Sequence, residues 1–270
     1  MDTRPIGVFD SGLGGLTTVK ELRRLMPGEN IVYFGDTGRV PYGTRSRETI
    51  IKYAKQDINF LLRHNVKMII SACGTVSSTI SYGVGKDLEV PFTGILLPGA
   101  QAACAMSTNG IIGVVGTPAT IRFGEFGKLV RSIRPEAKVI GNPCPLLVPI
   151  VENGLISPED EIARLAVEMY IKPLKAEGID TLILGCTHYP LLYEVFNKAL
   201  DYKVTLIDSG RETARNVRSF LSEKDMLGEN KGGTSEYYVT DSTDGFTQVA
   251  EMFLGDKIEG HVHRVDLDTL

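Results

Sequence analysis

Short apolar runs rich in β-branched residues recur along the chain, and longer segments with a helical period separate most of them. An apolar run of four or so residues that stops at a glycine or a polar residue is typical of a buried parallel strand. We therefore predict strands at residues 5–10, 30–36, 67–73, 91–96, 110–117, 138–144, 181–186 and 203–208.

Three of the intervening segments, residues 16–26, 48–65 and 159–178, repeat apolar positions every three or four residues, as amphipathic helices do. Strands and helices that alternate in this way predict an α/β fold whose parallel sheets are covered on both faces. Ligands of such sheets bind at the carboxyl ends of the strands. The residues that follow each predicted strand are therefore the candidates for a functional site.

Two of these strand ends resemble each other. IISACGT at 69–75 and LILGCTH at 182–188 each run from aliphatic residues through a small residue to a cysteine, with a hydroxyl within two places. The two cysteines, Cys73 and Cys186, are separated by 186 − 73 = 113 positions. This likeness suggests two similar α/β units that face each other, each contributing one thiol.

Composition narrows the class of protein. The chain has 270 residues, enough for one large or two modest domains, with a formal charge of −4 and no basic block, so nucleic acid is not an expected partner. No apolar stretch approaches the length that spans a bilayer, and the charged N-terminus does not resemble a secretory signal. The four cysteines are too few and too scattered for a disulfide scaffold or a zinc site. We expect a cytoplasmic enzyme with free thiols.

The cysteines divide into two kinds. Cys104 and Cys144 are expected to be inert core thiols, because cysteine is among the most buried residue types. Cys73 and Cys186 are followed by hydrogen-bond donors at strand ends, and such donors favour the reactive thiolate. Beside Cys186, His188 is a credible proton shuttle.

The glycine-rich segment after the first strand, residues 9–19, has two interpretations. A strand, a glycine loop and a helix can hold a phosphate, and Asp36 after the second strand could then bind a ribose. The glycines do not fit G-x-G-x-x-G, however, because the third position falls on Thr17. The loop more simply allows backbone amides to approach a small anion such as a carboxylate. Asp10 places a charge at a buried strand end, which is costly unless the carboxylate has a partner or a functional role.

Several reactions use thiols. Hydrolysis by a Cys–His pair needs one nucleophile, a redox pair needs closely spaced sulfurs, and a metal site needs more ligands than this sequence offers. Inverting a carbon stereocentre instead requires a base on one face and an acid on the other. Two cysteines at opposed strand ends, one thiolate and one thiol, match that requirement.

The motifs GVFDSGLGGLTTV, GDTGRVPYG, SACGT, VGTPAT and GCTHYP, in this order and spacing, resemble those of the glutamate racemases, a cofactor-independent two-cysteine family. The C-terminal segment EYYVTDSTDGFTQVAEMFLG resembles the same family, so the likeness covers almost the whole chain. Aspartate racemases share the two-cysteine plan but usually end the second motif with Glu rather than His.

The resemblance implies two α/β domains with the active site between them. Residues 1–96 and 208–270 would form the first domain and residues 97–207 the second. Cys73 would face the α-hydrogen of D-glutamate, assisted by Asp10. Cys186 would face that of L-glutamate, assisted by His188 and Glu152.

The resemblance also implies a set of substrate-binding positions. These are Asp10, Ser11, Pro41, Tyr42, Gly43, Gly74, Thr75, Thr117, Thr120, Thr187 and His188. One position departs from the family, which often has Cys-Asn-Thr where this chain has Cys73-Gly74-Thr75. Gly74 offers only its backbone, so the side-chain amide that in the family contacts the substrate is absent here.

The expected function is therefore the racemisation of glutamate for bacterial peptidoglycan synthesis, in the cytoplasm, with no cofactor and no metal. The only expected partner is the small-molecule substrate, with neither nucleic acid nor membrane involved. The sequence is compatible with a homodimer but does not specify one. Two alternatives stay open: a racemase of another acidic amino acid such as aspartate, and a dicarboxylate-binding protein without turnover.

Overall fold

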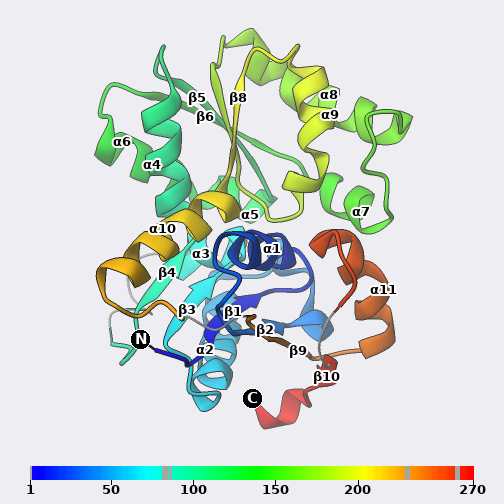
Figure 1. Cartoon of the computed structure of the whole chain (residues 1–270). Coiled ribbons are helices and arrows are strands. Elements are labelled where there is room, and N and C mark those ends of the chain that lie inside the picture. Colours follow the sequence, from blue (N-terminus) through cyan, green and yellow to red (C-terminus); the bar gives the residue numbers. More distant parts are fainter. Residues whose placement is uncertain (1, 81–84, 86, 229–231, 259–261) are drawn as a thin grey trace.

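Two separate parallel sheets organise the computed structural model, which describes residues 2–80, 85, 87–228, 232–258 and 262–270 (Figure 1). The six-stranded sheet has the order β10 (Val262–Arg264), β9 (Ser235–Val239), β2 (Ile31–Gly35), β1 (Ile6–Asp10), β3 (Met68–Ser71) and β4 (Phe92–Gly94). The four-stranded sheet has the order β6 (Lys138–Pro143), β5 (Ile111–Gly116), β7 (Thr181–Leu184) and β8 (Thr205–Asp208). Each predicted run forms one of the strands β1 to β8, so these predictions are confirmed.

Helices connect the strands within each sheet and between the two. We call the six-stranded sheet with its connecting helices the six-stranded half; these helices are α1 (Leu16–Leu25), α2 (Arg47–Arg63), α3 (Gly74–Ile80) and α11 (Thr243–Leu254), with the short η1 (Thr37–Arg39), η2 (Tyr42–Thr44) and the terminal η4 (Leu267–Thr269). The four-stranded half contains α5 (Pro118–Phe123), α6 (Glu125–Ile133), α7 (Leu147–Glu152), α8 (Glu161–Ala176), η3 (Tyr189–Leu192) and α9 (Tyr193–Ala199). The chain crosses between the halves through α4 (Leu96–Met106) and α10 (Ser209–Glu223).

The two sheets repeat one topology. Four neighbouring strands of the larger sheet run β2-β1-β3-β4, and the smaller sheet runs β6-β5-β7-β8 in the same pattern. Strands β3 and β7, whose ends carry Cys73 and Cys186, therefore occupy equivalent places. The predicted fold class, α/β with two similar parallel sheets, is confirmed.

The strands form where the pattern predicts because both of their faces are covered. Every residue of β1, β2, β3 and β7 is buried, as expected for parallel strands between layers of helices. Side chains also fix where helices begin. Ser46 accepts a hydrogen bond from the Thr49 amide at the start of α2, and Asp208 accepts one from the Arg211 amide at the start of α10.

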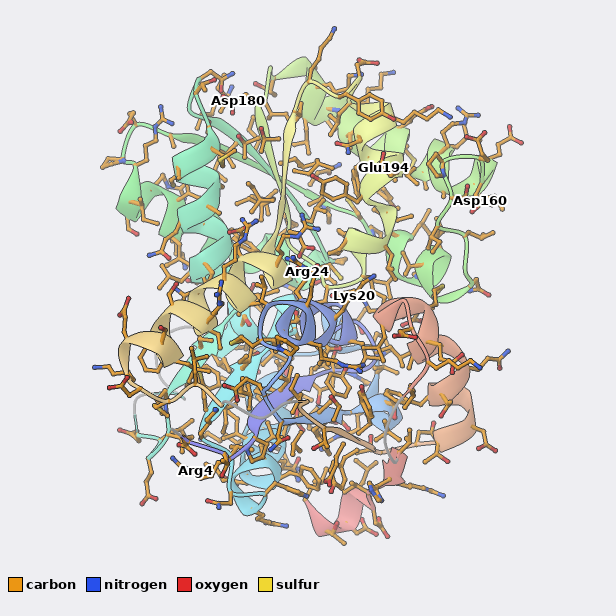
Figure 2. The ribbon with its side chains drawn as sticks, in the orientation of Figure 1. Arg4, Lys20, Arg24, Asp160, Asp180 and Glu194 are labelled. Carbon is orange, nitrogen blue, oxygen red and sulfur yellow. The ribbon has the colours of Figure 1, made fainter. Side chains whose placement is uncertain are left out.

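The carboxyl ends of the two sheets point toward each other. Figure 2 labels Arg4, just before β1, and Asp180, just before β7, near opposite ends of the molecule, whereas Lys20 and Arg24 of α1 lie at the junction. One apolar core cluster runs through this junction and includes residues of both halves, such as Leu16 and Leu182. The chain therefore holds its two rows of strand ends against each other.

The C-terminal strands were not predicted. β9 alternates buried and more exposed residues, and β10 lies at the sheet edge with its last two residues exposed. Neither has the continuous apolar run by which the other strands are recognised. Among the described residues, no helix combines the length and the apolar character needed to cross a membrane.

A buried ion pair links separate segments of the six-stranded half at the end remote from the junction. Lys67 Nζ lies 2.6 Å from Glu29 Oε2, and the two side chains are 0% and 2% exposed. The same ammonium donates to the backbone oxygens of Asp2 and Met226, at 2.9 and 2.7 Å, while Glu29 Oε1 accepts the Gly228 amide. One pair thus ties together the chain before β1, the start of β3 and the segment after α10.

Replacing Lys67 with Met should lower the free energy of unfolding by about 3–5 kcal/mol, because it leaves the buried Glu29 carboxylate without its counter-ion. Chemical denaturation measures this loss. The matched control is Lys138→Met, which removes the exposed pair with Glu177 and should cost less than about 1 kcal/mol. Equal losses of unfolding free energy in the two variants would show that the buried Lys67 pair stabilises the fold no more than the exposed pair does.

Candidate active site

A cavity of about 400 Å³ lies where the carboxyl ends of the two sheets meet. Most of the predicted site residues line it: Ser11, Pro41, Tyr42, Gly43, Cys73, Gly74, Thr75, Thr117, Glu152, Cys186, Thr187 and His188. Residues from both halves therefore share one chamber, including the two thiols from equivalent strands. Among the described residues that line it, none is a lysine or an arginine.

Cys73 follows β3 and is almost completely buried at 5% exposure. Its Sγ lies 3.4 Å from Ser11 Oγ, on the loop after β1. Burial and the nearby negative charge of Asp10 raise the pKa of Cys73 to about 12. Cys73 is therefore a neutral thiol near pH 7 and is able to donate a proton.

Cys186 follows β7 and is paired with an imidazole. Its Sγ lies 3.7 Å from His188 Nδ1, and His188 Nε2 lies 3.0 Å from Glu152 Oε1 at the end of α7. Burial lowers the pKa of His188, but the hydrogen bonds with Cys186 and Glu152 outweigh it and raise the pKa to about 10. The ring is therefore a cation near pH 7, and a positive charge beside a sulfur stabilises a thiolate.

Asp10 ends β1 and lies behind the cavity wall at 1% exposure. Its Oδ2 accepts the Gly12 amide at 2.8 Å, whereas its Oδ1 has no hydrogen-bond partner among the described residues. Burial raises the pKa of this carboxyl, and the positive charge of His188 opposes that rise. A buried carboxylate oxygen without a partner is costly unless the site uses it.

Hydroxyl groups connect the two halves at the cavity. Thr75 Oγ1 lies 2.9 Å from Thr117 Oγ1, and Thr17 Oγ1 donates to the Thr187 carbonyl at 2.8 Å. Thr120 does not line the cavity; its Oγ1 lies 3.0 Å from Thr117 Oγ1. Thr120 would therefore act on a ligand only indirectly, by its hydrogen bond with Thr117. These hydroxyls are neutral donors of the kind that can hold a carboxylate.

The Tyr42 hydroxyl does not face the cavity. It donates to Asp36, which also takes hydrogen bonds from Arg39 Nε at 2.5 Å and from Thr240 Oγ1 at 2.9 Å. Asp36 is fully buried, so this network occupies the carboxyl that the nucleotide interpretation would assign to a ribose. The network instead holds the loop that carries Pro41, Tyr42 and Gly43 against the cavity.

The position that departs from the family has a steric explanation. A β-carbon on Gly74 would come closer than 3.0 Å to the carbonyl oxygen of Gly185, on the opposite half. A backbone oxygen cannot swing away as a side chain can. In this arrangement of the halves, no side chain fits at position 74.

Part of the wall was not predicted. Cys144 and Pro145, which follow β6, and Val148 and Pro149 of α7 line the cavity. Cys144 is buried, as expected, but it belongs to the wall rather than to a remote core. The rule of inspecting every strand end, applied to the predicted strand at 138–144, would have found it. Cys104 on α4 lies outside this cavity.

The geometry suits acid–base chemistry at a carbon atom between two thiols. Among the described residues, no group of three or more His, Cys, Asp or Glu side chains is placed to hold a metal ion. The two thiols differ in environment, because Cys73 is a neutral thiol near a carboxyl and Cys186 lies beside an imidazolium. One can therefore accept a proton while the other donates one.

Comparison with known proteins agrees with this chemistry. Residues 16–217 match the family described as Asp/Glu/hydantoin racemase. A glutamate racemase from Geobacter metallireducens is 41% identical over 269 residues, which covers 99% of this chain and 98% of that protein. The crystal structure of glutamate racemase isoform RacE1 from Bacillus anthracis has a TM-score of 0.94 at 37% identity, covering 99% of each chain.

A second solved structure carries a ligand. Glutamate racemase from Francisella tularensis, in complex with D-glutamate, has a TM-score of 0.90 and 38% identity and covers 100% of each chain. Likeness of this extent, over the full length and at these identities, establishes kinship as well as fold. The chain belongs to the Asp/Glu/hydantoin racemase family, among the glutamate racemases.

Proposed function

We propose that this chain interconverts L- and D-glutamate by a two-base mechanism that uses Cys73 and Cys186. The observation that carries the proposal is that two thiols at equivalent strand ends, one from each half, line a single cavity. The glutamate racemases to which the chain is similar, one of them in complex with D-glutamate, favour glutamate over aspartate as the substrate.

In the proposed reaction from L-glutamate, the Cys186 thiolate removes the α-proton and the Cys73 thiol returns a proton to the opposite face. The enzyme then holds a Cys186 thiol and a Cys73 thiolate, and the reverse reaction exchanges the roles. The neutral Cys73 thiol and the His188 imidazolium beside Cys186 suit this direction, in which Cys186 acts as the base and Cys73 as the acid. Before the next turnover from L-glutamate, Cys73 must regain a proton from water and Cys186 must release one to water, and Asp10 would assist the return of the proton to Cys73.

The substrate's two carboxylates would be held by neutral groups, because the described lining contains no lysine or arginine. The proposed donors are the side chains and backbone of the loops after the strands, at Ser11, Gly43, Gly74, Thr75, Thr117 and Thr187. Pyridoxal enzymes hold their cofactor through a Schiff-base lysine. In the proposed mechanism the two thiols supply both proton transfers, and no cofactor takes part.

The wider role is part of the same proposal. D-glutamate made in the cytoplasm would supply bacterial peptidoglycan synthesis and so support cell shape.

The positions of the strands support the domain boundaries expected from the sequence. The strands of the six-stranded sheet fall within 1–96 or 208–270, and those of the four-stranded sheet fall within 97–207 except for Asp208 at the end of β8. A homodimer stays a prediction, which light scattering of the purified protein would test.

Circular dichroism of L- and D-glutamate incubated separately with the pure protein tests the proposed function directly. Both solutions should lose their signal, and the α-position should take up deuterium in D₂O. Faster loss with aspartate would favour the alternative racemase. No deuterium uptake from either amino acid would identify a binding protein without turnover.

Replacing either active-site thiol with alanine should abolish racemisation, because each acid–base step is worth roughly 10²–10⁴-fold and every turnover needs both. Cys73→Ala and Cys186→Ala should therefore lose several orders of magnitude, whereas Cys104→Ala, whose thiol lies outside the cavity, should keep wild-type activity. Polarimetry or circular dichroism measures the rates. Full activity in either cavity variant would refute the two-base assignment.

The variants Cys73→Ser and Cys186→Ser should show which thiol acts on which face of the substrate's α-carbon. Enantiomers have equal free energy, so kcat/KM for racemisation is the same in both directions in any variant, and a probe of one face is needed. With 3-chloroglutamate, removal of the α-proton expels chloride from the β-carbon, and hydrolysis then gives 2-oxoglutarate and ammonium. Cys73→Ser should keep chloride release from the L isomer better than from the D isomer, and Cys186→Ser should show the opposite preference.

Gly74→Ala should slow chloride release from both isomers by roughly 100-fold, because the added β-carbon forces the halves apart and misplaces both thiols. The control is Gly232→Ala, whose added carbon would meet no described atom within 4 Å. Wild-type rates in Gly74→Ala would show that the junction relaxes without cost to the chemistry.

Glu152→Gln should lower the pH above which the enzyme stops removing the α-proton of L-3-chloroglutamate. The Glu152 carboxylate helps to raise the pKa of His188 to about 10, so its loss lowers that pKa, and the imidazolium that supports the Cys186 thiolate disappears at lower pH. Chloride release from L-3-chloroglutamate across the pH range measures the shift. The substrate's own amino group titrates equally in both enzymes, so an unchanged limit would exclude this role for Glu152.

A further inference from the structure

The imidazole of His188 belongs to the four-stranded half, but two segments of the six-stranded half enclose it. One is the loop between β1 and α1, at Gly14, and the other is α11, at Phe253. In Figure 1, α11 lies beside α1 on the side of the junction where α7 lies. The ring is thus enclosed by two segments that lie far from it and from each other in the sequence.

Gly14 passes directly against the ring. A β-carbon at this position would lie 2.5 Å from His188 Nδ1 and 2.7 Å from its Cε1, and it would also collide with the Thr187 hydroxyl. The absence of a side chain therefore lets the loop cover the ring at close range. Nδ1 is the nitrogen that faces Cys186 Sγ, so this contact lies beside the reacting group.

Phe253 meets another side of the ring. It is completely buried, its ring centroid lies 5.2 Å from that of His188, and the two planes are almost perpendicular at 89°. This is the edge-to-face geometry that aromatic rings favour, and it depends on the angle between the planes. A buried phenyl ring in this position restrains rotation of the imidazole about its side-chain bonds.

The polar contacts of His188 do not restrain the ring so well. The sulfur contact is long, at 3.7 Å, and Glu152, which holds the other nitrogen, has a side chain that is 41% exposed. An exposed carboxylate can follow a rotating ring, so it fixes the plane weakly. The plane of the ring is therefore set mainly by apolar packing and by the close backbone of Gly14.

We propose that Gly14 and Phe253 are positioning residues for His188, which hold its Nδ1 toward Cys186. Both come from the half that does not carry Cys186, so the Cys186 acid–base pair is complete only while the two halves are in contact. Cys73 differs, because its partners Ser11 and Asp10 belong to its own half. This inference rests on the proposed function. It adds that loss of either positioning residue slows proton removal by Cys186, which acts on the L isomer.

The test is chloride release from the two isomers of 3-chloroglutamate by Phe253→Leu, Gly14→Ala and wild-type enzyme. Phe253→Leu keeps an apolar side chain but loses the ring, and Gly14→Ala pushes the imidazole away. Each should slow release from the L isomer by roughly 10–100-fold, because a displaced acid–base partner costs about that much. For Phe253→Leu, release from the D isomer should stay within about twofold in the same sample, which shows that the enzyme is folded. Gly14→Ala also displaces the Thr187 hydroxyl, so it should slow both isomers but the L isomer more than the D isomer.

The matched control is Phe246→Leu, the same change on the same helix. Phe246 is also buried, but its neighbours are the rings of Tyr33 and Tyr237, at 6.3 and 6.2 Å, rather than His188. It should show no preference between isomers. Equal losses for both isomers in Phe253→Leu and Gly14→Ala, no loss, or a loss confined to the D isomer would each overturn the inference. Wild-type enzyme that acts on neither isomer would instead overturn the proposed function.

Discussion

The approach of Gly74 to the carbonyl oxygen of Gly185 is the contact on which the site depends. It joins the first residue of α3 in one half to the residue after β7 in the other, with no side chain between them. Cys73 precedes the first of these glycines and Cys186 follows the second, so the contact sets where the two thiols stand relative to each other. Around it, the Thr75–Thr117 and Thr17–Thr187 hydrogen bonds hold the same junction together.

The electrostatics of the cavity follow from the absence of lysine and arginine among the described residues that line it. A substrate with two carboxylates and an ammonium would meet hydroxyls, backbone amides and the cation His188 rather than a lysine or arginine clamp. A lysine or arginine close to the thiols would hold them charged, whereas this proposed chemistry needs each thiol to gain and lose a proton. The His188 cation lies beside Cys186, whereas the buried carboxyl of Asp10, behind the cavity wall, lies near Cys73. Similar sheets thus present thiols in unlike environments.

The site also shows how the two halves depend on each other. Cys73 draws its partners from a neighbouring strand of the same sheet, so its environment forms when that half folds. Cys186 draws on Glu152 of α7 and, in our inference, on Gly14 and Phe253 across the junction. Within the six-stranded half, the Asp36 network behind Tyr42 also joins distant segments: Thr240, which follows β9, donates a hydrogen bond to Asp36 and accepts one from the Gly38 amide.

The sequence by itself determined the strands β1 to β8, the parallel α/β class and the two thiols at matching strand ends. These could be read because burial on both faces leaves a continuous apolar run, and because a strand's carboxyl end is marked by the residues that follow it. β9 and β10 left no such run, since they lie toward a sheet edge with partly exposed faces. Tertiary structure alone decided which way the Tyr42 hydroxyl points, that Cys144 belongs to the cavity wall, and why position 74 holds no side chain. Each of these depends on which atoms of a distant segment lie within a few ångströms, and no local pattern of residues contains that information.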